Sequence, residues 1–590
     1  MKKALFALCI AMFAAGKFAS AEKAAGLATA PISDAVIVDR GAHHRTWQRV
    51  RDNVHPSGKI TKGTNYIVEL CSGLHYQENG QWIETEEAIL PDFQKGGASA
   101  AHGPHKVWFA PNLNTADAFE IAMPDGQILR GHVAGLAYWD PASGKSALVA
   151  QVKDATGEII QPNQVVYLKC FTDFAISVRY TYTKGGIEQD LILHEQIPPP
   201  GNWGLPETSI LQVYTEFTQA PEPTQEIAPS AKSLDTNSPV KNAEPVLTFG
   251  SMGFGSGKAF SLDSGIALGV KDTGVPVQKS WEKIERRTFL IEAVPYGKVS
   301  NDLQTLPLKS AALSTKSKES LVAEATKPLQ KRWMPPPPAM KRTSDHALAF
   351  AKSRDLKGYV IDYQLVSSDK TDFTFARNTN YLISGACRFF GTTTIEGGTV
   401  VKYVTTTPSS IELNNSVVNT AVCATDPYLP AVFTSRNDDT VGEIISAAGT
   451  PLRYDTAIRV PNGQKSLKNL QIRHANVAFN LGSGSTLALN HAQIAHCGTA
   501  FSMQDAESDI RNALVEDITT ACFAGTGYTV DAGYLTLKDC PLLAADSGGP
   551  LASDVYLKNT LLANVPALGN EFSDREPNKH RRPERNRIRL

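Results

Sequence analysis

The chain has 590 residues, of which 42% are apolar and 20% charged, and its formal net charge is −1. This length is too great for one ordinary hydrophobic core, so several domains are expected. The apolar content excludes general disorder, and with a near-neutral charge we expect no nucleic-acid partner.

The first 21 residues have the pattern of a secretory signal peptide. A positive start at Lys2 and Lys3 precedes the apolar run 4–15, and Ala19-Ser20-Ala21 offers an A-x-A cleavage site. Removing residues 1–21 takes away three Lys and no acids, which leaves 55 basic against 59 acidic residues. No later stretch is apolar enough to span a bilayer. We therefore expect an exported protein, secreted or at the cell surface, with no transmembrane segment in the mature chain.

Seven cysteines remain after this cleavage, and none forms a C-x-x-C pair. An odd number of cysteines spread over this length does not indicate a disulfide framework. Without a C-x-x-C pair, a structural zinc site is not expected. Buried, inert thiols are the expectation.

The N-terminal half is predicted to be rich in short strands. Residues 22–217 contain alternating apolar runs separated by turns such as Pro124-Asp125-Gly126, which is typical of an antiparallel β-sandwich-like domain. A Pro-rich linker is expected at 218–245, a small β unit at 246–308 and a second Pro-rich linker at 309–345.

A six-residue pattern recurs in the C-terminal half: apolar, any, Asn/His/Asp, small or apolar, any, apolar. Its polar anchors are 22, 21, 27 and 20 residues apart, and they are Asn469, His491, Asn512, Asp539 and Asn559. A strand-based repeat near this length predicts a solenoid in which stacked rungs share one core. We assign 346–568 to this solenoid, and 569–590 to a basic, disordered tail with net charge +3.

The stacked Asn-type turns resemble the asparagine ladder of right-handed parallel β-helix proteins, the architecture of pectate lyases and of many exported bacterial surface proteins. The segments 381–385, 392–403 and 430–435 also look like those of large, uncharacterised secreted bacterial proteins. The resemblance implies an all-β protein with a right-handed parallel β-helix and an exported location. It implies no particular activity.

A second set of polar residues lies five positions after the anchors. If the rungs stack about 4.8 Å apart, His474, His496 and Asp517 can form one column, next to Glu516. Two imidazoles and a carboxylate in a column can hold a metal or a ligand, and a solvated polar column is the alternative.

Acidic residues gather before the regular rungs, at Asp438, Asp439 and Glu443. Such hard oxygen ligands make Ca²⁺ the candidate cofactor, with a solvated acidic turn as the alternative.

Two segments resemble the histidine and nucleophile signatures of trypsin-like serine proteases, around His496 and Ser547. Only 51 residues separate them, too few for the intervening strands of a double barrel, so we interpret the match as coincidental.

The sequence thus predicts an exported, non-catalytic surface or secreted interaction protein that binds a polysaccharide or cell-surface component through the β-helix face. The alternative is a polysaccharide lyase or glycoside hydrolase on the same scaffold. Hydrolases require paired carboxylates, and in the regular rungs Glu516 and Asp517 are the only adjacent acidic pair.

Overall fold

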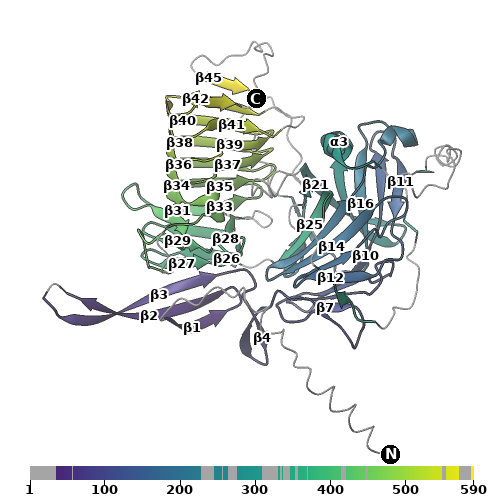
Figure 1. The fold of residues 1–590 in the computed structure, drawn as a ribbon, viewed down its shortest axis with the longest axis horizontal. Coiled ribbons are helices and arrows are strands. Elements are labelled where there is room, and N and C mark those ends of the chain that lie inside the picture. The colour runs from purple at the N-terminus through teal and green to yellow at the C-terminus, as the bar shows by residue number, and fades with distance from the viewer. Residues whose placement is uncertain are drawn as a thin grey trace, which may run out of the picture.

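The structure is a computed structural model that describes residues 35–55, 57–227, 245–254, 257–262, 275–308, 330–331, 335–336, 346–352, 356–367, 370–413, 420–445, 450–547, 553–569 and 586–589. Strands account for 62% of the described residues, which form an N-terminal near-barrel sheet and a parallel β-solenoid (Figure 1). The predicted all-β fold class is confirmed. The predicted signal peptide at 1–21 lies outside the described residues. So do residues 228–244 of the first predicted linker, and 309–329, 332–334 and 337–345 of the second.

The near-barrel is built mainly from antiparallel neighbours that follow one another along the chain. Its strands are β6 (Leu90–Pro91), β7 (Ala98–Ala100), β8 (Lys106–Phe109), β9 (Phe119–Ala122), β10 (Ile128–Asp140), β11 (Lys145–Gln151), β12 (Gly157–Gln161), β13 (Gln164–Tyr167), β14 (Ile176–Thr183), β15 (Gly186–Leu193), β16 (Ile210–Gln219), β17 (Thr224–Ile227), β18 (Pro245–Phe249), β19 (Met252–Phe254), β20 (Gly257–Ser261), β21 (Val275–Ile284), β22 (Arg287–Pro295), β23 (Gln330–Lys331), β24 (Ala349–Phe350) and β25 (Tyr359–Ser367). A short 3-10 helix, η1 (Pro200–Trp203), and helix α3 (Tyr296–Thr305) accompany the sheet.

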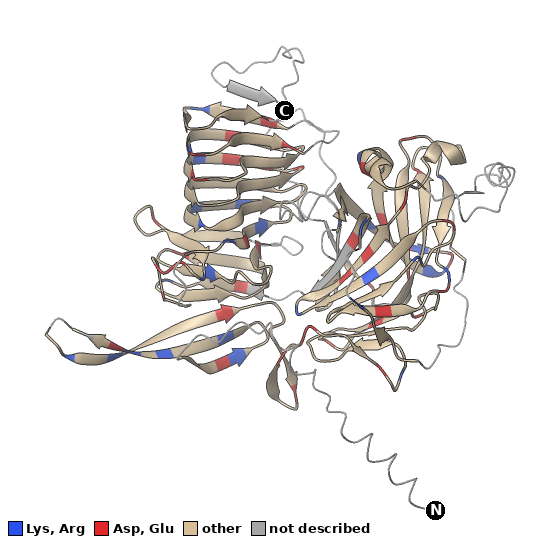
Figure 2. Ribbon diagram, viewed as in Figure 1, with Lys and Arg blue, Asp and Glu red and all other residues tan. Residues whose placement is uncertain are grey.

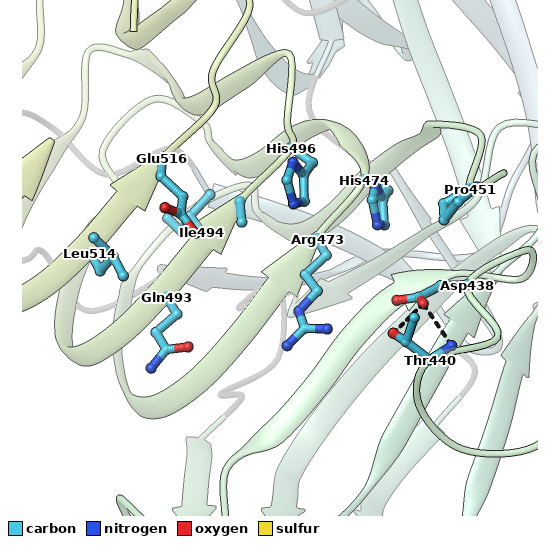
Figure 3. A pocket seen from close by; sticks show the side chains of 11 residues that line it. Asp438, Thr440, Pro451, Arg473, His474, Gln493, Ile494, His496, Leu514 and Glu516 are labelled. Atoms are coloured by element: carbon cyan, nitrogen blue, oxygen red, sulfur yellow. Dashed lines mark hydrogen bonds between the residues drawn. The ribbon is translucent and has the colours of Figure 1, made fainter. Parts of the chain in front are cut away.

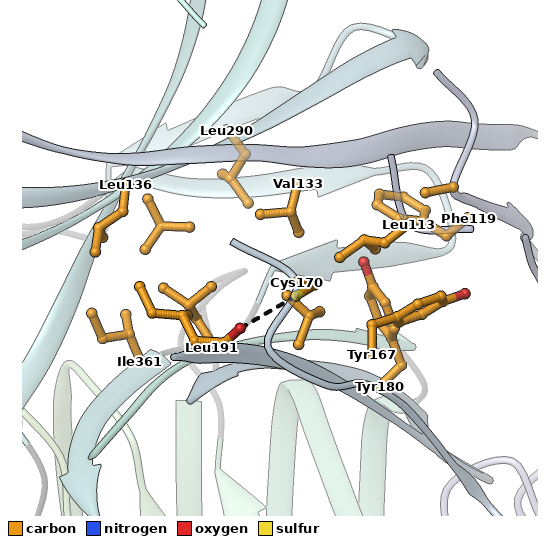
Figure 4. Close-up of a cluster of buried hydrophobic side chains, with 14 of the residues drawn as sticks. Leu113, Phe119, Val133, Leu136, Tyr167, Cys170, Tyr180, Leu191, Leu290 and Ile361 are labelled. Carbon is orange, nitrogen blue, oxygen red and sulfur yellow. Dashed lines mark hydrogen bonds between the residues drawn. The ribbon is translucent and has the colours of Figure 1, made fainter. Parts of the chain in front are cut away.

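The interior of the near-barrel is a continuous apolar core (Figure 4). Val133 and Leu136 from β10 face Leu191 from β15 and Ile361 from β25, all at most 2% exposed. The Sγ atom of Cys170 donates to the carbonyl of Ile176 within this core. Of the seven described cysteines, six are buried and Cys423 is partly buried, and none is in a disulfide.

The first described strands belong to the solenoid and not to the near-barrel. The strands β1 (Ala35–Gly41), β2 (His44–Val54) and β3 (Ile60–Leu70) form an antiparallel unit, and β3 runs parallel to β27 (Asn380–Ile383) through pairs such as Ile67 with Asn380. The hairpin β4 (His75–Glu78) and β5 (Gln81–Glu84) follows. A solenoid core must be closed at its ends, and β3 covers the first rung here. The outer part of the β2–β3 hairpin extends beyond the rungs and carries several Lys and Arg residues (Figure 2).

The solenoid has about eight turns in residues 373–569 and consists of two parallel sheets. With β27 (Asn380–Ile383), the first sheet contains β29 (Val400–Tyr403), β32 (Ala431–Ser435), β34 (Gln464–Arg473), β36 (Thr486–Ala495), β38 (Glu507–Glu516), β40 (Thr529–Lys538), β42 (Asp554–Lys558) and β43 (Leu561–Ala563). The second contains β26 (Lys370–Phe375), β28 (Ala386–Glu396), β30 (Ser410–Leu413), β31 (Thr420–Ala424), β33 (Tyr454–Val460), β35 (Ala475–Leu481), β37 (Thr499–Gln504), β39 (Ala521–Thr526), β41 (Leu542–Asp546) and β44 (Ala567–Gly569).

Equivalent apolar positions of successive rungs stack inside the solenoid. Leu467, Leu489 and Ile510 are fully buried one above another on the first sheet. On the second sheet, Phe479 stacks on Phe501 with ring centroids 5.4 Å apart, and Phe501 on Phe523 at 5.3 Å. The predicted repeat therefore corresponds to a continuous core shared between rungs.

The register corrects one copy of the repeat. Along the first sheet, Arg511 pairs with Gly533, and Ala513 with Leu535, so the residue aligned with Asn512 is Tyr534. Asp539 instead aligns with Asp517, because Glu516 pairs with Lys538. The sequence pattern required Asn, His or Asp at the anchor. It therefore assigned the anchor of this rung to Asp539, five residues after the correct position at Tyr534.

Two columns of corners with positive φ run along the rungs. The first contains Asn469, His491, Asn512, Tyr534 and Asn559, with φ between 50° and 58°. The second contains His474, His496, Asp517, Asp539 and Asn564, with φ between 50° and 58°. Asn, Asp and His tolerate this left-handed conformation better than most residues, which explains why they recur at the corners.

The last described strand, β45 (Asn586–Arg589), pairs antiparallel with β42 (Asp554–Lys558). It lies in the segment 569–590, where the sequence predicts a disordered tail, and it covers one edge of the final rung.

Strand β25 lies within the segment 346–568 that the sequence analysis assigns to the solenoid. It pairs instead with β15 of the near-barrel.

Candidate functional site

A cleft of about 400 Å³ opens on the surface of the solenoid where three rungs meet the loop after β32 (Figure 3). This volume is within the range of ligand pockets, roughly 300–1,000 Å³. The residues that line it are Asp438, Thr440, Pro451, Arg473, His474, Gln493, Ile494, Ala495, His496, Leu514 and Glu516. Three of the predicted binding residues, His474, His496 and Glu516, therefore share this cleft with the predicted calcium ligand Asp438.

The second corner column supplies the histidines. His474 and His496 follow Arg473 and Ala495, which are paired across β34 and β36, and their rings stack with centroids 5.1 Å apart and planes 10° apart. Figure 3 shows the two rings side by side at the edge of the cleft. The predicted column is thus present, because neighbouring rungs place equivalent corners one above the other.

Asp517 extends the column without lining the cleft. Its Oδ2 atom lies 2.6 Å from Nδ1 of His496. The side chain of Asp517 is 59% exposed and that of His496 is 50% exposed. This contact favours the imidazole tautomer that carries its proton on Nδ1. Nε2 of His496 then keeps a lone pair that can accept a proton or bind a metal.

Asp438 is held at the other end of the cleft by two threonines. Its Oδ2 atom accepts from the hydroxyl of Thr434 at 2.7 Å, and its Oδ1 atom accepts from the amide of Thr440 at 3.0 Å and the hydroxyl at 2.5 Å. Burial alone raises the pKa of Asp438, but these hydrogen bonds and the nearby His474 outweigh it and lower that pKa below its usual value. Asp438 is therefore a firmly ionised carboxylate.

His474 has the opposite balance. Burial lowers the pKa of its imidazole, and the Asp438 carboxylate raises it. His496, Arg473 and Arg453 lower this pKa further, so it lies below its usual value. A neutral imidazole thus faces the Asp438 carboxylate at neutral pH.

The three predicted calcium ligands do not form a calcium site. The buried side chain of Lys402 enters this loop, and its Nζ atom donates to the carbonyls of Asp438 at 2.7 Å and Glu443 at 2.6 Å. The Glu443 carboxylate accepts from Nδ2 of Asn65 at 2.5 Å, and Asp439 is exposed. Among the described residues, these three carboxylates are not a group whose ligand atoms lie within 4.8 Å of one another, so they do not form a shared Ca²⁺ site.

The cleft also contains residues that the sequence pattern did not indicate. Arg473 and Gln493 face outward on β34 and β36, and Thr440 and Pro451 come from loops that fold against these strands. The loop residues have no periodic signal, and only their packing on the rungs brings them to the column. Glu516, which was predicted, lies 3.9 Å from Nζ of Lys538 on the next rung.

A different acidic cluster lies in the near-barrel. In the described part of the chain, the one group of three potential metal ligands with atoms within 4.8 Å of one another is Glu188, Asp190 and Asp362. Arg179 donates to Asp190 at 2.7 Å, and burial, followed by Glu188 and Asp190, raises the pKa of Asp362 well above its usual value. A protonated Asp362 beside the Arg179–Asp190 ion pair accounts for this cluster without a metal.

The protease-like motifs are not brought together. His496 contacts Asp517 and is followed by β37. Ser547 follows β41, which lies two rungs beyond β37 in the second sheet. The amide of Ser547 donates to the carbonyl of Gly525 at 2.9 Å, as part of the rung-to-rung stacking. The motif match is therefore a feature of the repeat.

Comparisons with protein-family models, with curated proteins and with solved structures found no match to this chain. Within the described residues, no helix has the length and apolar character needed to cross a membrane. The class defined by fold and site is a β-solenoid protein with a polar surface cleft.

Proposed function

We propose that this protein is exported and binds a polysaccharide in the surface cleft of its solenoid. One observation carries the proposal: a cleft of about 400 Å³ on the outer face of the rungs, lined by hydrogen-bonding side chains such as Arg473, Gln493 and Glu516. Sugar hydroxyls both donate and accept, so a mixed set of amide, guanidinium and carboxylate groups suits them.

The location is part of the same proposal. The signal-like residues 1–21 support export, and the resemblance to right-handed parallel β-helix proteins supports a secreted or surface-attached role. A rigid stack of parallel rungs presents a long face on which successive sugar units can contact successive strands.

An enzymatic function is the second candidate, supported by two carboxylates, Asp438 and Glu516, in the same cleft. Glycoside hydrolysis needs such a pair about 5–9.5 Å apart across the scissile bond. Asp438 already accepts hydrogen bonds from Thr434 and Thr440, and the lowered pKa of its carboxyl makes it a poor proton donor. A hydrolase would therefore need Glu516 as its proton donor, whereas binding needs no proton transfer from either carboxyl group.

A glycan array with the mature protein tests the proposal, with and without Ca²⁺. The variant Gln493→Trp places an indole in the cleft, whereas Thr536→Trp changes the same face of β40 outside it. We expect one class of polysaccharide to bind, Gln493→Trp to lose at least tenfold in affinity and Thr536→Trp to bind normally. Binding to no polysaccharide would refute the proposal, and release of shorter or unsaturated sugars would favour the enzyme.

A further inference from the structure

We propose that His474 and His496 form a binding site for a divalent transition-metal ion of the Zn²⁺, Ni²⁺ or Cu²⁺ class. The two imidazoles stand on neighbouring rungs, parallel to within 10° and with centroids 5.1 Å apart. Metal–nitrogen bonds of about 2.0–2.1 Å place two ligand nitrogens up to about 4 Å apart. The nitrogen lone pairs lie in the ring planes, so the two parallel rings must turn toward each other to bind one ion. His496 is half exposed and His474 partly exposed, which allows this turn.

The backbone fixes both ligands in the same orientation. His474 and His496 each have φ of 58°, and the backbone pairing of Arg473 with Ala495 aligns the residues before them. Equivalent corners of a β-solenoid repeat at the spacing of neighbouring strands. The scaffold thus presents two imidazoles as a pair and not as independent surface residues.

Asp517 supplies the outer partner that metal-bound histidines normally have. Its Oδ2 atom is 2.6 Å from Nδ1 of His496, which directs the lone pair to Nε2. A carboxylate in this position orients the ring and increases the basicity of the nitrogen that binds the metal.

The surrounding charges are compatible with a cation. Asp438, Glu516 and Asp517 provide three carboxylates near the rings, which balance the two guanidinium groups of Arg453 and Arg473 and the ammonium group of Lys538 beside Glu516. Both arginines are engaged: Arg453 donates to the hydroxyl of Thr519 at 2.8 Å, and Arg473 to Oε1 of Gln471 at 3.1 Å. Water or the Asp438 carboxylate can complete the coordination of an ion held by the two imidazoles.

The test is equilibrium binding of Zn²⁺, Ni²⁺ and Cu²⁺ to the full mature chain, purified without a histidine tag. We expect one saturable site, and a Cu²⁺ electron paramagnetic resonance spectrum with nitrogen couplings. His474→Asn and His496→Asn each abolish this site. Both variants should fold, because Asn564 occupies the same column with φ of 55°.

The chain offers a matched control. His491 is exposed on the other corner column, with φ of 55°, and Asn469 and Asn512 occupy its equivalent positions. His491→Asn should leave metal binding unchanged, whereas Asp517→Asn should weaken it about 10–100-fold.

Absence of saturable binding would overturn the proposal, as would equal loss of binding in His491→Asn and His496→Asn. Binding that survives both His474→Asn and His496→Asn would also overturn it. The inference does not depend on the proposed polysaccharide binding, because the metal measurement uses no glycan. Each proposal can therefore fail while the other stands.

Discussion

The Nδ1 atom of His496 lies 2.6 Å from Oδ2 of Asp517, which occupies the same corner of the next rung. Both residues have positive φ, at 58° and 50°, and both lie directly after a strand of the first sheet. The contact arises from the solenoid itself, because parallel pairing aligns every corner with its neighbour. A side-chain interaction in the candidate site is thus built from the repeat.

The corrected register predicts that Tyr534→Asn stabilises the solenoid. Tyr534 has φ of 58° and a side chain that is 60% exposed, so it bears the cost of a left-handed conformation with little burial in return. Asn tolerates this conformation, and the expected gain is about 1 kcal/mol in urea unfolding. The reverse change at the aligned position, Asn512→Tyr, should destabilise by a similar amount. A loss of stability in Tyr534→Asn would show that the exposed ring makes a stabilising contact.

Lys402→Met is expected to destabilise the solenoid by about 2–3 kcal/mol, because it leaves one buried and one part-buried carbonyl without their donor. The Lys402 ammonium currently bonds the carbonyls of Asp438 and Glu443, and its side chain has no exposed surface. The exposed Lys468 on β34 is the control, and Lys468→Met should have little effect in the same urea unfolding experiment. Equal stability of the two variants would contradict the structural role given to Lys402.

Gly525→Ala is expected to disrupt the stacking of β39 on β37. A Cβ atom at Gly525 would lie 1.7 Å from the carbonyl oxygen of Met503, and φ there is 137°. The combined overpacking and backbone strain should cost about 3 kcal/mol or more, measured as a lower unfolding midpoint. Gly297→Ala, where nothing lies within 4 Å of the added atom, should not lower the midpoint. A native-like midpoint for Gly525→Ala would mean that the rungs are less closely stacked than described.

Stability of the near-barrel should fall in acid because of His105. Burial lowers the pKa of this fully buried imidazole to about 4, from 6.5 in the unfolded chain. Between these values the unfolded state binds more protons, so stability is full above pH 6.5 and decreases as the pH falls toward 4. The loss is about 3 kcal/mol at 1.36 kcal/mol per pKa unit.

Denaturant unfolding of the wild type and of His105→Gln, between pH 7 and pH 4.5, checks this prediction. His105→Gln should show a weaker dependence on pH, although His132 and His194, whose pKa values are also lowered by burial, contribute in the same direction. His102 is exposed, and His102→Gln should keep the wild-type dependence. Identical pH profiles for all three proteins would exclude a role for His105.

Much of the solenoid could be predicted from sequence because its signal is local and repeated. Leu489 and Ile494 occupy the inward positions around the His491 corner, and the same spacing recurs in neighbouring rungs. The sequence pattern did not identify the copy at Tyr534, because it specified Asn, His or Asp at the anchor. The corner itself requires only a backbone conformation with positive φ. The pairing of β3 with β27 could not be predicted from the sequence pattern either, because the two strands are more than 300 residues apart in the chain.

The all-β class, the repeat and the column of His474 and His496 could be predicted from the amino-acid sequence, since they follow from residue spacing and strand geometry. The surroundings of that column depend on contacts between distant parts of the chain. The loop carrying Asp438 and Thr440 has no repeat and is held by the buried Lys402, which donates to the carbonyls of Asp438 and Glu443. Local periodicity therefore fixes the rungs, while long-range packing of irregular loops creates the cleft.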